Sequence, residues 1–324
     1  MNRCRFYTLS NKHSMSVTLC NYGARIVSIR VPNANGQLIE TTFADQSSSS
    51  LLNDQAFKGA TCGRVANRIG KASFVLEGQQ YHLEANEGKN ILHGGAGGFS
   101  QQTWFVDWHR KTYKADWLRM SYFSKDGDQG FPGNIRASVD FTLYDDNRLI
   151  LSFSAESDKA TPINMCNHSY FHLGEKDINA LELQVKAHKY LDVDKRGIPT
   201  GRFMQVDELV NLNQLRPIHS FLPNRPLDHC YILDTKSQGL HASKATALSS
   251  ARLVSRNKGI ALDIFTDQEA MQVYTGNFLE HPHRAIALEA QGLIDAVNHA
   301  HFKGDFAKPD DPYKKWLCYR FSHM

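Results

Sequence analysis

The chain has 324 residues, 41% of them hydrophobic, and a formal net charge of +4. This content can bury a sizeable core, and the length suits either one large β-domain or two smaller domains. The small net charge and the scattered basic residues argue against a nucleic-acid partner.

The cysteines and the first residues of the chain indicate the cellular compartment of the protein. Residues 1–5 lack the apolar stretch of a secretory signal, and no apolar run reaches the roughly 18 residues of a membrane span. The cysteines show no CxxC pairing, which predicts buried free thiols in a reducing compartment. We therefore expect a cytoplasmic protein with no membrane partner. The six cysteines are Cys4, Cys20, Cys62, Cys166, Cys230 and Cys318.

Alternation of apolar and polar residues with period two is the dominant pattern and predicts β-strands. Turn signals such as Asn35-Gly36 and Asp126-Gly127 separate the alternating segments. A hairpin is expected over residues 74–83, and helical periodicity is confined to two short stretches, 51–57 and 206–215. The clearest predicted strands are, in chain order, 27–31, 139–143, 181–186, 260–264 and 317–321.

Many short strands with frequent turns predict an all-β fold, a large antiparallel β-sandwich with a few short helices. The serine run at residues 47–50 is too short to be a linker, and no other Pro-, Gly- or Ser-rich stretch divides the chain. We therefore expect one domain over residues 1–324.

The most glycine-dense segment, residues 93–99 (HGGAGGF), does not match a phosphate-binding loop. It lacks the Gly-Lys-Ser/Thr of a P-loop and the strand–GxGxxG–helix context of a dinucleotide site. Its glycines suit a backbone that turns sharply beside a ligand, although a plain surface loop is equally compatible.

The segment 163–173 places a histidine on a polar strand face. If it is one strand, Asn164, Cys166, His168, Tyr170 and His172 share one side, and the apolar residues take the other. A titratable ring beside an amide, a thiol and a phenol suits a ligand-facing surface. Considered alone, a structural histidine is the commoner explanation.

In the segment 285–291, Glu289 shares its strand face with two alanines, Ala285 and Ala287. Small neighbours leave space beside the carboxylate for a polar substrate. Partial burial would raise its pKa towards the range of a general base. A solvent-facing glutamate on an edge strand fits the same pattern.

Further polar residues could bind hydroxyl groups. Arg68 offers a planar fork of donors, Asn67 an amide and Asp228 a bidentate acceptor. The pairs His281/His283 and His299/His301 lie outside any HExxH or Cys/His framework, so we expect no metal.

Seven ordered motifs resemble the aldose 1-epimerase, or galactose mutarotase, family. They extend from residue 63 to residue 291 and therefore cover most of the chain. The motifs are 63–69 (GRVANRI), 90–104 (NILHGG, GF and Trp104), 127–133 (ending GFPG), 161–171 (TPIN and NHSYF), 198–201 (IPTG), 272–277 (QVYTGN) and 288–291 (LEAQ).

The resemblance implies a galactose mutarotase-like supersandwich that interconverts the α and β anomers of free hexoses, galactose and glucose among them, without a cofactor. Glu289 would take the proton of the C1 hydroxyl, His168 would protonate the ring oxygen, and His93 would polarise the sugar near the reacting centre. The expected partner is a small-molecule aldohexose, and the expected state is a monomer or weak homodimer. The implied substrate-binding residues are Asn67, Arg68, Tyr170, Asp228 and Gln272.

Three departures from the family pattern concern the rim of the expected sugar site and bear on the sugar preference. His172 and Cys230 each stand where the family commonly has Asn, and residues 292–296 (GLIDA) replace an aromatic-Pro-Asp-Ala stretch.

Three other functions would require different residues. A phosphosugar epimerase needs several arginines, and only Arg64 and Arg68 lie near the motifs. A non-catalytic sugar-binding protein would be expected to lose Glu289 or His168. A glycosidase would use Glu289 with Asp228, whereas a histidine acid suits ring opening better.

Overall fold

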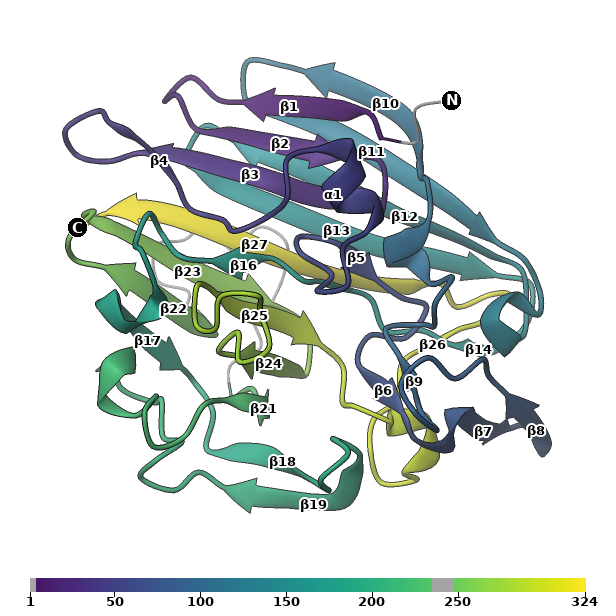
Figure 1. The fold of residues 1–324 in the computed structure, drawn as a ribbon. Coiled ribbons are helices and arrows are strands. Elements are labelled where there is room, and N and C mark those ends of the chain that lie inside the picture. Colours follow the sequence, from purple (N-terminus) through teal and green to yellow (C-terminus); the bar gives the residue numbers. More distant parts are fainter. Residues whose placement is uncertain (1–3, 235–247) are drawn as a thin grey trace.

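The computed structural model describes residues 4–234 and 248–324. Of the N-terminal segment 1–5 considered in the sequence, residues 1–3 therefore lie outside the described residues. The fold consists of β-strands with one α-helix in this part of the chain, α1 (Ser48–Leu52) (Figure 1). The predicted all-β class is therefore confirmed. No helix within the described residues is long and apolar enough to cross a membrane.

Two sheets form one layer. We call them the N-terminal sheet and the site sheet. A bridge between Thr42 and Phe171, with a hydrogen bond from Phe43 N to Tyr170 O (2.9 Å), joins them edge to edge. The N-terminal sheet holds β1 (Phe6–Ser10), β2 (Ser16–Cys20), β3 (Arg25–Pro32) and β4 (Leu38–Glu40); the site sheet holds, in spatial order, β16 (Tyr170–Phe171), β25 (Ile286–Gln291), β24 (Ala270–Tyr274), β21 (Asp228–Ile232), β18 (Lys189–Val193) and β19 (Pro199–Gln205).

A large antiparallel sheet forms the other layer. The C-terminal strand β27 (Tyr313–His323) lies in its middle, between β13 and β23, so distant parts of the chain meet there (Figure 1). That the whole chain is one domain stays a prediction. In spatial order the sheet holds β10 (Phe105–Lys111), β11 (Ala115–Ser124), β12 (Ile135–Tyr144), β13 (Arg148–Ser157), β27, β23 (Ile260–Thr266), β22 (Ala251–Ser255), β17 (Leu181–Val185) and β20 (Arg216–Pro217).

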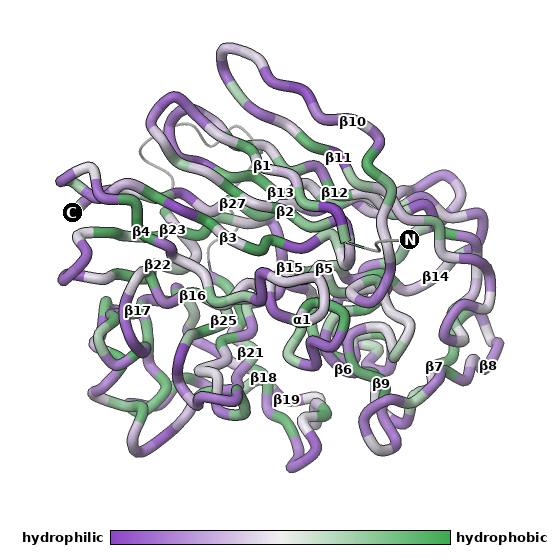
Figure 2. Tube along the Cα trace, turned by 45° about the horizontal axis from the view of Figure 1, so that its top comes forward, coloured by the Kyte–Doolittle hydropathy of each residue, from purple (hydrophilic) through white to green (hydrophobic). Residues whose placement is uncertain are grey.

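The main hydrophobic core fills the space between the layers. Ile286 and Leu288 of β25 belong to the same buried cluster as Leu317 of β27. In Figure 2 the hydrophobic stretches follow the inner strands, and the outlying loops are largely hydrophilic. The predicted alternating segments fall within strands, except that Lys186 lies just beyond the end of β17. Strand β23 is buried at every position, with Phe265 packed against Trp316 and Asp263 paired with Arg252 and Arg320.

Short ladders and 3₁₀ turns connect the sheets. The predicted hairpin is confirmed as β7 (Ser73–Leu76) with β8 (Gln79–His82). The other ladders are β5 (Thr61–Cys62) with β15 (Cys166–Asn167), β6 (Arg68–Ile69) with β9 (Ile91–Leu92), and β14 (Thr161–Pro162) with β26 (Phe306–Ala307); the 3₁₀ turns are Gly70–Ala72, Phe99–Gln101, Asp128–Gly130, Ile178–Ala180, Ile218–Ser220 and Ala296–Asn298.

Both helix predictions need correction. Helix α1 ends at Leu52, and Phe57 adopts a positive φ of 56°, which a continuing helix does not allow. Residues 206–215 form no helix. The Asp207 carboxylate accepts from the backbone N–H of Leu209 and Val210, and Asn213 bonds the backbone of residue 187. Such local side-chain bonds compete with helical hydrogen bonding.

Candidate active site

Adjacent rows of side chains across the site sheet form the floor of a pocket. Glu289 on β25 lies opposite Gln272 on β24, which lies opposite Cys230 on β21. These side chains point away from the core because their strand neighbours, such as Leu288 and Val273, face it. The face predicted for Glu289 is therefore confirmed. The next row, on the same face, consists of Tyr170, Ala287, Tyr274 and Asp228.

A broken strand brings His168 over this floor. Residues 163–173 contain two separate strands, β15 and β16, so the single strand considered for this segment is not formed. His168 lies in the gap between β15 and β16, where its backbone N–H donates to Ala60 O (2.8 Å) and its carbonyl accepts from Gly59 N (2.9 Å). His172 and Asn164 bind backbone instead, at Thr42 O (3.0 Å) and Gly292 N (2.9 Å).

His93 approaches from a loop that follows β9. Its φ is +50°, and its backbone N–H donates to Asn67 O (2.9 Å). The next residue, Gly94, has φ +82°, and a Cβ there would lie 2.0 Å from Gly63 O. The glycine-rich segment therefore turns tightly beside the site, as one of the two sequence interpretations proposed.

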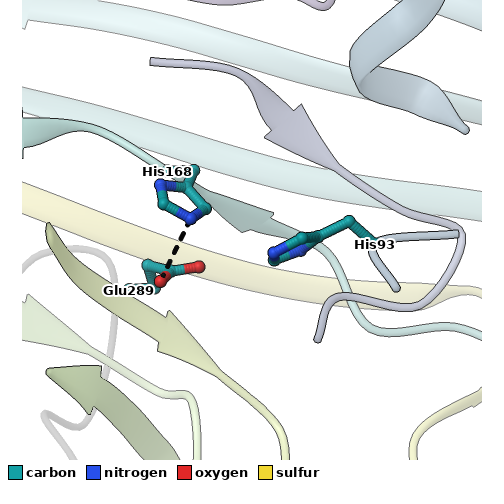
Figure 3. Close-up of side chains that lie close together, drawn as sticks. All are labelled: His93, His168 and Glu289. Atoms are coloured by element: carbon teal, nitrogen blue, oxygen red, sulfur yellow. Dashed lines mark ion pairs between the residues drawn. The ribbon is translucent and has the colours of Figure 1, made fainter. Parts of the chain in front are cut away.

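Figure 3 shows the three side chains converging. His168 Nε2 lies 3.4 Å from Glu289 Oε1. The His93 and His168 rings meet edge to face with their centroids 5.3 Å apart. Phe57 packs against His93 (4.6 Å between centroids), and Tyr170 packs against His168 (4.9 Å). These packed rings fix the position of His168 relative to the carboxylate.

Burial shifts the pKa values of the pair in opposite directions. Loss of water around the carboxylate, with a smaller effect of the Asp228 charge, raises the pKa of Glu289 to about 8. Burial also lowers the pKa of His168 to about 4. Near neutral pH the pair therefore holds one proton, which rests on the carboxyl group. Moving this proton to the imidazole leaves a carboxylate base beside an imidazolium acid.

The neutral form of His93 is fixed by a backbone contact. Burial holds the pKa of His93 well below its usual value. The ring Nδ1 accepts a hydrogen bond from Asn67 N (3.2 Å), so Nε2 carries the proton of the neutral ring. His93 therefore presents an N–H donor towards His168 and Glu289.

These three side chains are also the only group, among the described residues, that could hold a metal ion, with one ligand atom each within 4.8 Å. A metal at His93 Nε2 would have to displace the proton that the Asn67 contact keeps there. This arrangement does not favour a metal. One histidine of each pair noted in the sequence binds backbone instead, with His283 Nδ1 at Thr275 O (2.8 Å) and His301 Nε2 at Gly201 O (2.8 Å).

The rim holds the predicted hydroxyl-binding residues, with one addition. Arg68 forms a bidentate pair with Glu87, Nε to Oε2 and Nη2 to Oε1, both 2.7 Å. Gln272 Nε2 donates to Asp228 Oδ1 (2.5 Å), and Gln272 Oε1 has no partner among the described residues. Burial raises the pKa of Asp228. Glu87 was not predicted from the sequence, because its loop carries no recognisable motif.

Arg64 has a structural role. Its side chain is buried and donates to Ser124 Oγ (2.8 Å), Pro132 O (2.8 Å) and Lys125 O (2.7 Å). Of the two arginines near the motifs, only Arg68 reaches the pocket, and Glu87 already neutralises it. The arginine cluster that a phosphosugar epimerase would need is therefore not formed by these motifs.

The pocket has a volume of about 620 Å³. Past Arg68 and Asp228 it continues into a second cavity of about 750 Å³, and Phe278, 87% exposed, lines both. Cys230, one of the departures, lies in this second cavity. All eight residues predicted for the site line the first cavity: Asn67, Arg68, His93, His168, Tyr170, Asp228, Gln272 and Glu289.

Comparison with known proteins identifies the family. The pattern of the family described as "Aldose 1-epimerase" matches residues 5–320. The chain is 33% identical to "Aldose 1-epimerase" of Escherichia coli, over 98% of this chain and 95% of the relative. It is 31% identical to "Galactose mutarotase" of Homo sapiens, over 95% and 91% of the two chains.

Solved structures agree. A GalM/aldose epimerase homologue from C. elegans superposes with a TM-score of 0.90 at 26% identity, over 99% of both chains. Galactose 1-epimerase from Lactobacillus acidophilus superposes with a TM-score of 0.86 at 25% identity, over 99% of this chain and 95% of the other. The protein is thus an isomerase of the aldose 1-epimerase family, to which this chain belongs.

Proposed function

We propose that the protein interconverts the α and β anomers of free hexoses, galactose and glucose among them, through acid–base ring opening by Glu289 and His168. The observation that carries this proposal is the buried pair, with His168 Nε2 3.4 Å from Glu289 Oε1. The pair holds one proton and can place it on either partner.

In the forward direction the Glu289 carboxylate takes the proton of the C1 hydroxyl while the His168 imidazolium protonates the ring oxygen O5. The C1–O5 bond breaks and C1=O1 forms, which gives the open aldehyde. After rotation about C1–C2, neutral His168 takes back the O5 proton as O5 attacks C1, and Glu289 returns a proton to O1. The pair is then restored, so the cycle requires no redox group and no covalent enzyme intermediate.

The remaining site residues have supporting roles. The Nε2–H of His93 would donate to an oxygen near the reacting centre, because its tautomer leaves it only a donor there. The hydroxyl groups would bind Asn67, Arg68 and Asp228, with Tyr170 and Gln272 lining the pocket. Positioned acid–base groups each contribute roughly 10²–10⁴ in rate, which is the share we assign to Glu289 and to His168.

Polarimetry of freshly dissolved α-D-galactose and α-D-glucose tests the proposal. The wild type should accelerate mutarotation over buffer, and Glu289→Gln or His168→Asn should lower kcat by roughly 10²–10⁴ with an unchanged circular dichroism spectrum. If the wild type bound sugar without accelerating mutarotation, the protein would be a sugar-binding module instead.

We further propose a reducing, cytoplasmic location, which the six buried free cysteines support. The expected monomer or weak homodimer stays a prediction that sedimentation of the full chain can measure.

A further inference from the structure

The carboxylate of Glu289 has two oxygens in different surroundings. Oε1 faces His168 Nε2 at 3.4 Å, and Oε2 lies 3.6 Å from Cys166 Sγ, whose thiol donates to it. Both partners come from one segment, because Cys166 lies on β15 and His168 two residues later. Among the described residues, this thiol forms the one hydrogen bond to the buried carboxylate, while His168 Nε2 faces Oε1 as its ion-pair partner.

From this contact we infer that Cys166 is a positioning residue for ring opening. Its thiol holds Oε2, so that Oε1 stays directed at His168 and at the C1 hydroxyl of the sugar. This inference rests on the proposed function of Glu289 and adds a residue that touches neither the sugar nor the reacting atoms.

The thiol lies in a closed layer behind the glutamate. Cys62 on β5 is the register partner of Cys166, and both side chains are fully buried with Ala66. Cys62 interacts with Cys166, and the carboxylate interacts with Cys166 from the other side. A thiol enclosed in this way cannot turn towards solvent, so the donor is held against Oε2.

The electrostatic effect follows from the direction of the hydrogen bond. A donor stabilises the ionised carboxylate, so Cys166 opposes the rise that burial causes in the pKa of Glu289. The charge of Arg68 also lowers the pKa of Glu289, whereas the charge of Asp228 raises it. The other titratable groups facing this carboxylate are His93 and His168 above it, Tyr170, Tyr274 and Cys230 on the site sheet, and Tyr319 on β27 behind it.

Removing the donor should have two linked kinetic effects. The active form of the enzyme has one proton on the His168–Glu289 pair. At high pH Glu289 gives up that proton, and activity is lost. In Cys166→Ala this alkaline limb of kcat/KM should move up by roughly half to one pH unit, a typical effect of one hydrogen bond. The carboxylate–imidazolium form should become rarer by the same factor, so kcat near neutral pH should fall about 3- to 10-fold.

The experiment measures kcat and kcat/KM for α-D-galactose between pH 5 and 10 in the wild type, Cys166→Ala, Cys166→Ser and Cys62→Ala. Serine keeps a donor and should restore the wild-type limb and kcat. Cys62→Ala removes the neighbouring thiol but keeps the donor to Glu289, so it should shift the pH profile less than Cys166→Ala does. Thermal unfolding of each variant reports packing separately.

An unshifted limb and an undiminished kcat in Cys166→Ala would overturn the inference, as would an equal shift in Cys62→Ala. Absence of activity in the wild type would instead refute the proposed function, so the two failures are distinguishable.

Discussion

Replacing Glu289 with glutamine should make the fold more stable at high pH while it abolishes activity. The carboxylate is buried, and its pKa rises from 4.5 in the unfolded chain to about 8 in the folded protein. The folded state therefore binds a proton that the unfolded state has already lost between these two values. The contribution of Glu289 to the free energy of unfolding of the wild type therefore falls as the pH rises from 4.5 to 8.

The size of the effect follows from the two pKa values. At about 1.4 kcal/mol for each pH unit, a span from 4.5 to about 8 corresponds to a cost of about 5 kcal/mol when the folded carboxylate is fully ionised. Roughly 1 kcal/mol of this cost is already present at pH 5. The stability advantage of Glu289→Gln over the wild type should therefore grow by about 4 kcal/mol between pH 5 and pH 9.

Urea unfolding at pH 5, 7 and 9 measures this advantage through the free energy of unfolding. Glu156→Gln is the matched control, because Glu156 is exposed on β13 and its replacement should give no such growth. The same series in a His168→Asn background removes the titrating partner. An advantage that stays constant with pH, or a Glu289→Gln protein less stable than the wild type at pH 9, would refute the reasoning.

Three further outcomes are expected. The kcat/KM of the wild type should follow a bell in pH, with apparent pKa values near 4 and 8 that belong to the His168–Glu289 pair; a rate that keeps rising to pH 10 would contradict a one-proton pair. Asp228→Asn should raise KM for galactose by roughly 10- to 100-fold with a smaller change in kcat, because a charged acceptor of hydroxyl hydrogens is lost at the pocket rim. Initial rates over a concentration series measure this, and an unchanged KM would remove Asp228 from the sugar site. His93→Phe should lower kcat by about 10²–10³ through loss of its Nε2–H donor, whereas His172→Phe, at a histidine that bonds backbone, should change stability more than kcat; equal kcat losses in both would argue against a catalytic role for His93.

Strand alternation correctly places Glu289 on the face of β25 that forms the pocket floor. The period of two fixes which side chains of a regular strand point together, and β25 is regular. The same rule misleads at residues 163–173, because that segment leaves the β15 ladder and joins the β16 ladder. His172 and Asn164 consequently turn to backbone partners.

Contacts between distant segments are beyond the reach of local patterns. The pairing of Arg68 with Glu87, the packing of Phe57 on His93 and the thiol contact at Glu289 join residues 19 to 123 positions apart. In each of these contacts the two residues belong to different local sequence patterns, so neither pattern predicts the contact. The helix prediction at 206–215 fails for a local reason, because Asp207 and Asn213 bond the backbone more favourably than a helix would.

The central claim is that His168 and Glu289 act as one acid–base pair at the anomeric carbon. Two-dimensional NMR exchange spectroscopy of galactose at anomeric equilibrium measures enzymatic α-to-β and β-to-α conversion directly, with the wild type, His168→Asn, Glu289→Gln and the double variant. We expect exchange cross-peaks between the two C1 protons with the wild type. Each single variant should lose nearly as much rate as the double variant, because neither group works without the other. Near wild-type exchange in either single variant would contradict the account.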